Sequence, residues 1–266
     1  METKKYEELI NTTLKITPII RQQHSRAYQE PTLQDAQRSL RAGSGIKGKS
    51  EEFGSWYESQ LIKWARDRGR IIGNLNFELD GREDAGGFEH HVFFHEETQR
   101  WVKITKYDTF KFGQTIHPSI IGWERAAANP LECITRYISS NQILNDTIEL
   151  HGVYVDFSQH PHIITSQADI QGTPIQEKDL EDMEMAMYEA GFIPVGNDDY
   201  YNMEENYYLG DINQENIIIT PKGYTIIDAV AALPNLELQE ALYQRAEEVK
   251  HFIEPKIQPA PLNLNR

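Results

Sequence analysis

The stretch that decides the fold reads LGDINQENIII (residues 209–219) and, one residue later, PKGYTIID (residues 221–228). Asp211 and Asn216 stand five residues apart. Two short apolar runs, 216–220 and 224–228, flank the turn-forming sequence Pro221-Lys222-Gly223, so they predict a tight hairpin. Asp228 closes the second run. The pattern therefore places three oxygen-bearing side chains on two adjoining hairpin segments.

This spacing is typical of chemistry on phosphate groups. An Asp followed five residues later by Asn is the spacing of a kinase catalytic loop, in which the transfer step needs a proton acceptor and well-placed metal rather than covalent help. Asp211 can accept the proton of an attacking hydroxyl. Asn216 and Asp228 can supply oxygen ligands of the kind that Mg²⁺ prefers.

Outward from this centre, the sequence predicts a mixture of strands and helices. Tyr57, Leu61, Trp64 and Ala65 recur on one face of a helix that ends at Gly69, and a further helix begins at Pro130, where proline suits the first turn. Runs of β-type residues predict strands at 71–77, 89–94, 100–105, 148–157 and 162–168. Two more helices are expected over 176–190 and 236–253. The fold class is α+β.

Composition limits the function classes. The chain has 266 residues, a net charge of −15 and one cysteine, Cys133, so no intramolecular disulfide or cysteine-cluster metal site is expected. Residues 1–50 carry nine Lys and Arg against five Asp and Glu, which leaves −19 for the remainder. Because residues 51–266 are this acidic, they repel nucleic-acid phosphates, and no nucleic-acid partner is expected. No stretch is apolar enough to span a membrane or serve as a signal-peptide core, so a cytoplasmic protein is expected.

Four segments in order resemble a known family: GGFEHHVFFHEETQRWVKITK (86–106), PLECITRYISSNQILND (130–146), IITSQADIQGTPI (163–175) and YYLGDINQENIIITPKGYTIIDA (207–229). The loop resembles the G-D-x-x-x-x-N loop of aminoglycoside-phosphotransferase-like and other atypical bacterial kinases. The whole order is similar to the kinase domain of bacterial polyvalent proteins, which phages and mobile elements encode. The resemblance covers roughly residues 55–235.

The resemblance implies ATP and Mg²⁺ as cofactors and a role for each of several residues. Lys103 would contact the α- and β-phosphates, with Glu132, or less directly Glu124, as its orienting acid. Asp211 would be the catalytic base, and Asn216 and Asp228 the metal ligands. Gly86 and Gly87 would be the remnant of a glycine-rich loop over the phosphates, and a hinge that receives adenine would be formed by Ser166, Gln167 and Ala168.

The same resemblance implies a reduced protein-kinase-like two-lobe fold with a helical N-terminal extension. The expected parts are an extension and linker at 1–50, a strand-rich N-lobe with one major helix at 51–170, and a reduced C-lobe at 171–266, with ATP between the lobes. The acceptor would be a hydroxyl on an unknown protein or small molecule.

Departures from the ordinary kinase pattern keep other interpretations open. Leu209-Gly210 stands where His-Arg is usual, and Asp228-Ala229-Val230 replaces Asp-Phe-Gly. These differences support a nucleotide-binding pseudokinase, serving as a regulatory or interaction module, as the alternative, whereas the intact metal-binding positions Asn216 and Asp228 oppose it. Transfer of AMP in place of phosphate is a third possibility.

Two other site patterns are weaker. Gly43, Gly48, Lys49 and Ser50 match the spacing of a phosphate-binding Walker loop, but no apolar strand precedes them, so a linker is the better interpretation. His90 and His91 are neighbours on a predicted strand and point to opposite faces, which argues against a shared zinc ion.

Overall fold

The computed structural model describes residues 32–42, 50–73, 89–95, 98–107, 111–120 and 122–257, without the side chains of 50–54 and 254–257. The chain divides into two compact units. Unit 1 comprises Met1–Thr115 and Arg125–Asp169, and unit 2 comprises Ile116–Glu124 and Ile170–Arg266. The architecture is mixed α and β, with several sheets and few helices. Within the described part of the chain, no helix combines the length and the apolar character that crossing a membrane requires.

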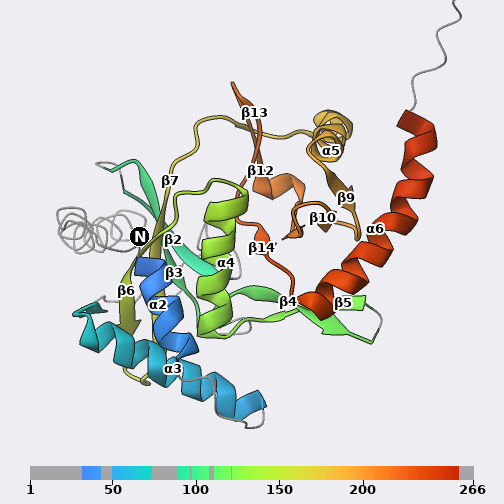
Figure 1. The fold of residues 1–266 in the computed structure, drawn as a ribbon. Helices are drawn as coiled ribbons and strands as arrows, with labels where there is room; N and C mark the ends of the chain where they lie inside the picture. The colour runs from blue at the N-terminus through green and yellow to red at the C-terminus, as the bar shows by residue number, and fades with distance from the viewer. Residues whose placement is uncertain are drawn as a thin grey trace, which may run out of the picture. The chain divides into compact units, whose positions relative to one another are not determined.

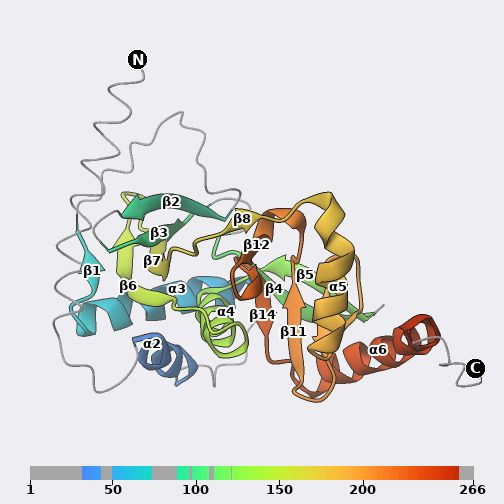
Figure 2. The ribbon, with the colours of Figure 1, turned by 90° about the horizontal axis from the view of Figure 1, so that it is seen from above.

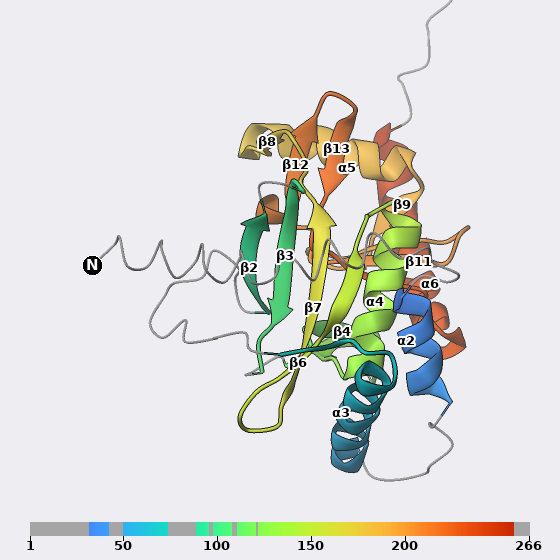
Figure 3. The ribbon, with the colours of Figure 1, turned by 90° about the vertical axis from the view of Figure 1, so that its left-hand side faces the viewer.

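The described part of unit 1 contains a five-stranded sheet of order β1-β6-β7-β3-β2 and three helices. Neighbouring strands are antiparallel except β1 and β6, which are parallel. Figures 1 and 3 show the three helices gathered beside this sheet. The elements are α2 (Thr32–Arg41), α3 (Ser50–Asp67), β1 (Ile71–Ile72), β2 (His90–His95), β3 (Arg100–Thr105), α4 (Pro130–Ile143), β6 (Glu149–Val155) and β7 (Pro161–Ala168).

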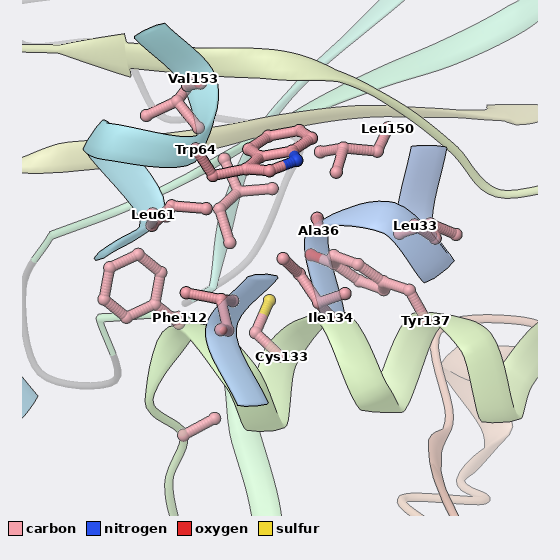
Figure 4. Packing of buried hydrophobic residues seen from close by; sticks show 14 residues of the cluster. Leu33, Ala36, Leu61, Trp64, Phe112, Cys133, Ile134, Tyr137, Leu150 and Val153 are labelled. Carbon is pink, nitrogen blue, oxygen red and sulfur yellow. The ribbon is translucent and has the colours of Figure 1, made fainter. Parts of the chain in front are cut away.

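The core of unit 1 lies between the helices and the sheet (Figure 4). Helix α2 lies within the first fifty residues, which the sequence analysis assigned to an extension, yet Leu33, Ala36 and Leu40 are buried in this core. The side chain of Asp35 joins α2 to α3 by accepting hydrogen bonds from Trp64 Nε1 at 2.9 Å and Arg68 Nε at 2.8 Å. Helix α2 is therefore an integral part of unit 1.

Helix α4 begins where the sequence predicts, and its cap explains why. Asn129 is the N-cap, and its side chain accepts from the backbone N–H groups of Leu131 and Glu132. The Glu132 carboxylate in turn accepts from the Asn129 N–H at 2.8 Å. This reciprocal capping box satisfies backbone donors that a helix terminus otherwise leaves unpaired.

A buried ion pair fixes α4 to the residue before β2. Arg136 is 7% exposed, and its Nη2 lies 2.8 Å from Glu89 Oε2, while Glu89 Oε1 accepts from the Gln114 N–H at 2.9 Å. Gly113 lies so close that a Cβ there would be 2.7 Å from both charged groups, so only glycine fits. Burial opposes ionisation of Glu89, but the attraction of Arg136 outweighs it, and the pKa of Glu89 is lowered.

Unit 2 contains a four-stranded antiparallel sheet of order β14-β11-β10-β9 and a three-stranded sheet of order β13-β12-β8. Helices α5 and α6 both contact β9 (Figure 1), and Figure 2 shows the same two helices from above. Its elements are β8 (Thr173–Pro174), η1 (Glu177–Asp179), α5 (Leu180–Glu189), β9 (Phe192–Pro194), β10 (Tyr200–Asn202), β11 (Tyr207–Gly210), η2 (Gln214–Asn216), β12 (Ile217–Thr220), β13 (Gly223–Ile226), β14 (Val230–Ala232) and α6 (Leu236–Ile257).

One hairpin contributes to both units and was not predicted. Strands β4 (Gln114–Ser119) and β5 (Gly122–Ala127) pair with each other, and their tip belongs to unit 2. Ile116 and Trp123 from this tip pack in the core of unit 2 with Tyr208 and Leu242. The hairpin sequence QTIHPS and GWERAA lacks the alternation that would mark a half-buried strand, which is why pattern reasoning missed it.

Truncation of Leu61, which is completely buried, tests the core of unit 1. Leu61→Ala should lower the free energy of unfolding by about 3 kcal/mol, because it removes buried methyl groups and leaves a cavity. Urea unfolding followed by circular dichroism measures this loss. The matched control is Lys63→Ala on the same helix, whose side chain is 68% exposed and whose ion pair with Asp67 contributes little. Equal losses in both variants would contradict the packing described.

Glu89→Gln tests the buried ion pair through pH. Because the folded-state pKa of Glu89 is lowered, its contribution to stability is present above the ordinary value of 4.5 and is lost as pH falls through the folded-state value. At pH 7 the variant should be less stable by roughly 3 kcal/mol, since Arg136 stays buried without its counter-ion. Thermal unfolding across the acid range should show the gap to wild type narrowing as pH falls. A gap that is constant with pH would rule out ionisation as its source.

Candidate functional site

The loop that carries Asp211 is held at both of its ends. Strand β11 ends at Gly210, which pairs with Val230 of β14. A Cβ at position 210 would lie 2.9 Å from carbon atoms of the Tyr208 ring, so the buried tyrosine requires glycine immediately before Asp211. On the other side, the N–H of Ile212 donates to the Asp198 carbonyl at 3.0 Å. The position of Asp211 is thus fixed by its neighbours in the chain.

The Asp211 carboxylate accepts hydrogen bonds on both oxygens. Asn213 Nδ2 lies 3.2 Å from Oδ1, and Asn216 Nδ2 lies 3.2 Å from Oδ2. Asn216 Nδ2 also donates to the backbone carbonyl of Asp211 at 2.9 Å. The two residues predicted to form the catalytic pair are therefore in direct contact, and an unpredicted residue, Asn213, supports them.

Asp228 is brought to the same place through the backbone. The N–H of Ile227 donates to the Asn216 carbonyl at 2.8 Å, continuing the β12–β13 ladder in which Ile217 pairs with Ile226. Strand β13 ends two residues earlier than the sequence predicts, and Asp228 lies in the short connection to β14. The structure therefore brings together Asp211, Asn216 and the backbone that carries Asp228.

Both aspartates adopt the left-handed backbone conformation, with φ of +63° at Asp211 and +55° at Asp228. Residues other than glycine rarely adopt this conformation, which costs of the order of 1 kcal/mol per residue and persists only when the surroundings impose it. Here the ladder bonds on either side impose it. Among the described residues the same conformation occurs at Gln99, Lys111, Asn145, Gln159 and Asn206, and Asp tolerates it better than most residues, so it does not by itself mark a site.

The two predicted metal ligands carry oxygen donors, which Mg²⁺ prefers. The Asn216 amide nitrogen faces Asp211, so its amide oxygen is the atom that could act as a ligand, and Asp228 could add a carboxylate. Within the described residues, no three His, Cys, Asp or Glu side chains form a group that could hold a metal ion. An oxygen pair of this kind suits a Mg²⁺ ion that takes its other ligands from water and substrate phosphates.

Lys103 lies in unit 1, on β3, and its Nζ donates to Gln167 Oε1 on the neighbouring strand β7 at 3.0 Å. Gln167 Nε2 donates in turn to Asp146 Oδ1 at 2.9 Å, and Asp146 Oδ2 accepts from the Ser140 hydroxyl of α4. From the sequence, Gln167 is expected only as a hinge residue, and no role is expected for Asp146. The alternation of side chains along β3 and β7 was the signal that could have paired Gln167 with Lys103.

The remaining predicted residues are placed as follows. Glu132 closes the capping box of α4, whereas Gly86 and Gly87 lie outside the described residues. Ser166 is completely buried, and its hydroxyl contacts Arg100 Nε and His151 Nε2, each at 2.7 Å. The Ser166 carbonyl accepts from Arg100, and the Ala168 N–H donates to Thr147 Oγ1. These two backbone groups are therefore engaged within unit 1, and the chain passes into unit 2 just after Asp169.

Comparison with known proteins gives one match. A family model described as a serine/threonine/tyrosine kinase found in polyvalent proteins matches residues 55–235, about two-thirds of the chain. No curated protein and no solved structure matches the chain. The match spans both units and includes Lys103, Asp211, Asn216 and Asp228.

Asn216→Asp tests the contact at the centre of the site. The change removes the amide donor and puts a second carboxylate about 3 Å from Asp211, so the free energy of unfolding at pH 7 should fall by about 1–3 kcal/mol. Two adjacent carboxylates bind a proton more tightly in the folded state than in the unfolded one, so part of the loss should be recovered near pH 4. Urea unfolding at the two pH values measures this difference. An identical loss at both would show that the carboxylates do not face each other.

Proposed function

The chain belongs to the family of serine/threonine/tyrosine kinases found in polyvalent proteins, and from this premise we propose that it transfers the γ-phosphate of ATP to a hydroxyl group. The acceptor is a side chain of a protein or a small molecule, and the reaction depends on Mg²⁺. The observation that carries the proposal is the direct contact of Asp211 with Asn216 beside the backbone of Asp228.

Asp211 acts as the base. Its two oxygens accept from neutral amides, which orient the carboxylate and leave it lone pairs for the proton of the acceptor hydroxyl. As the hydroxyl oxygen bonds to the γ-phosphorus, the bond from that phosphorus to the β,γ-bridging oxygen breaks, and ADP leaves. The proton ends on Asp211 and then passes to solvent.

Asn216 and Asp228 hold Mg²⁺, which when bound neutralises the negative charge of the phosphates during transfer. The rigid ladder behind both residues means that little reorganisation is needed when the ion arrives. Preorganised charge stabilisation of this kind is commonly the largest contribution to catalysis of phosphoryl transfer.

Lys103 contacts the α- and β-phosphates, as the family resemblance implies. Gly86 and Gly87, which lie outside the described residues, keep the role over the phosphates that the resemblance implies, and the backbone beyond Asp169 receives adenine. We assign adenine to this stretch because the Ser166 carbonyl and the N–H groups of Ala168 and Asp169 already have partners. Glu132 contributes by starting α4.

A pseudokinase is the second candidate, because Leu209-Gly210 replaces the usual His-Arg and Ala229-Val230 follows Asp228. ATP labelled at either the α- or the γ-phosphate separates the possibilities. Label transferred from the γ-position identifies a kinase, and label from the α-position identifies transfer of AMP. Binding without transfer identifies a pseudokinase.

Asp211→Ala should lower turnover of γ-labelled ATP by about 10²–10⁴-fold, because it removes the proton acceptor. Glu215→Ala is the matched control, since Glu215 is an exposed acid in the same loop. The control should keep the wild-type rate. Unchanged turnover in Asp211→Ala, in a preparation free of other kinases, would remove Asp211 from the role of base.

A further inference from the structure

We propose that Gln167 and Asp146, rather than Glu132, position Lys103 for its contact with phosphate. The proposal rests on the function assigned above, because it concerns how the phosphate-binding lysine is held. It assigns a positioning role to Gln167, which the family resemblance implied was a hinge residue, and to Asp146, for which the resemblance implied no role. The observation behind it is the hydrogen-bonded series from Lys103 through Gln167 and Asp146 to Ser140.

The chemistry of the neighbours fixes the direction of the Gln167 amide. A lysine ammonium can only donate hydrogen bonds, and an ionised carboxylate can only accept them. The amide oxygen must therefore face Lys103 and the amide nitrogen must face Asp146, which matches the distances of 3.0 Å and 2.9 Å. If the Gln167 amide were flipped, its NH₂ group would face the Lys103 ammonium, which is also a donor, and its oxygen would face the Asp146 carboxylate, which is also an acceptor. Gln167 consequently has one stable orientation.

The register of the sheet places the side chains of Lys103 and Gln167 within reach of each other. Trp101 pairs with Gln167 and Lys103 with Thr165, so Lys103 and Gln167 are diagonal neighbours on one face. Ile163 lies on the same face of β7 and is buried in the core that contains α4. Lys103 therefore projects from the helix-covered face of the sheet.

Two residues of this hydrogen-bonded series are buried, which makes loss of their hydrogen bonds costly. Gln167 is 6% exposed and Ser140 is 3% exposed, so an unsatisfied polar atom there is expensive. Ser140 is fixed in the last turns of α4, and its hydroxyl holds the second oxygen of Asp146. The amide oxygen presented to Lys103 is thus held by the carboxylate behind it, which reduces the freedom that the flexible lysine must lose on binding phosphate.

The position of Glu132 explains why it does not have this role. Glu132 lies in the first turn of α4, eight residues before Ser140, which corresponds to about 12 Å along the helix axis. Its carboxylate is used in the capping box. The hydrogen bond from Lys103 to Gln167, by contrast, leads through Asp146 to Ser140 near the carboxyl end of α4.

The test combines the reactivity of Lys103 with the kinetics of ATP use. Acetylation of Lys103 by acetic anhydride is measured by mass spectrometry against Lys222, an exposed lysine in the β12–β13 turn. Gln167→Leu should raise acetylation of Lys103 several-fold, because it removes the acceptor that holds the ammonium. It should also raise the KM for ATP about tenfold with a smaller change in kcat, as expected for loss of a contact made before and during transfer.

Two further variants make the result decisive. The double variant combines Gln167→Glu with Asp146→Asn. The new carboxylate at position 167 accepts from Lys103, and the new amide at position 146 donates to that carboxylate. Every hydrogen bond is kept, and only the bond between positions 167 and 146 changes direction. This variant should restore both the acetylation rate and the KM for ATP, whereas a merely structural defect would persist. Glu132→Gln should leave both unchanged.

The proposal is overturned if Gln167→Leu changes neither the acetylation of Lys103 nor the KM for ATP. It is also overturned if the double variant behaves like Gln167→Leu, or if Glu132→Gln has the effect expected of Gln167→Leu. Increased acetylation with an unchanged KM would also overturn it, because Lys103 would then be held but not positioned for nucleotide. Failure of the proposed function is a separate result, since wild-type protein would then transfer no γ-label whatever the acetylation rates.

Discussion

The hydrogen bond from the Ile227 N–H to the Asn216 carbonyl is the constraint on which the candidate site depends. Together with the pairing of Gly210 and Val230, it ties the segment that carries Asp211 and Asn216 to the segment that carries Asp228. These backbone bonds bring the two segments together, and the Asn213 and Asn216 side chains then orient the Asp211 carboxylate. The same backbone bonds permit two aspartates to persist in the left-handed conformation.

In unit 1, side-chain hydrogen bonds and an ion pair, rather than backbone hydrogen bonds, tie separate segments together. Two buried polar networks engage α4, the Glu89–Arg136 ion pair and the series that ends at Ser140. A partly satisfied polar network in a core would be destabilising, so each must be complete to be tolerated. Lys103 belongs to the second of these networks, so hydrogen bonds through Gln167 and Asp146 link it to Ser140 of α4.

The sequence predicted those parts whose local signals agree with one another. Strand β3, the start of α4 at Pro130, and strands β6 and β7 lie where apolar runs and capping residues indicated them, to within one or two residues. The α+β class was confirmed, and so was the family. The hairpin of β4 and β5, the outer strands β9 and β14 of the four-stranded sheet and the burial of α2 were missed, because each depends on packing partners distant in the sequence rather than on a local period.

At the site, the order of residues along the chain sets which residue types stand at which spacing: the pair Asp211 and Asn216, and Asp228 beyond a hairpin. These are local features, set by turn chemistry and by the two-residue period of strands. That Asn213 supports Asp211, that Gln167 meets Lys103 and that Glu132 caps a helix became visible only in the folded chain. The physical reason is that hydrogen-bond partners are chosen by distance and direction in space, and sheet register and helix packing fix both only when the chain is folded.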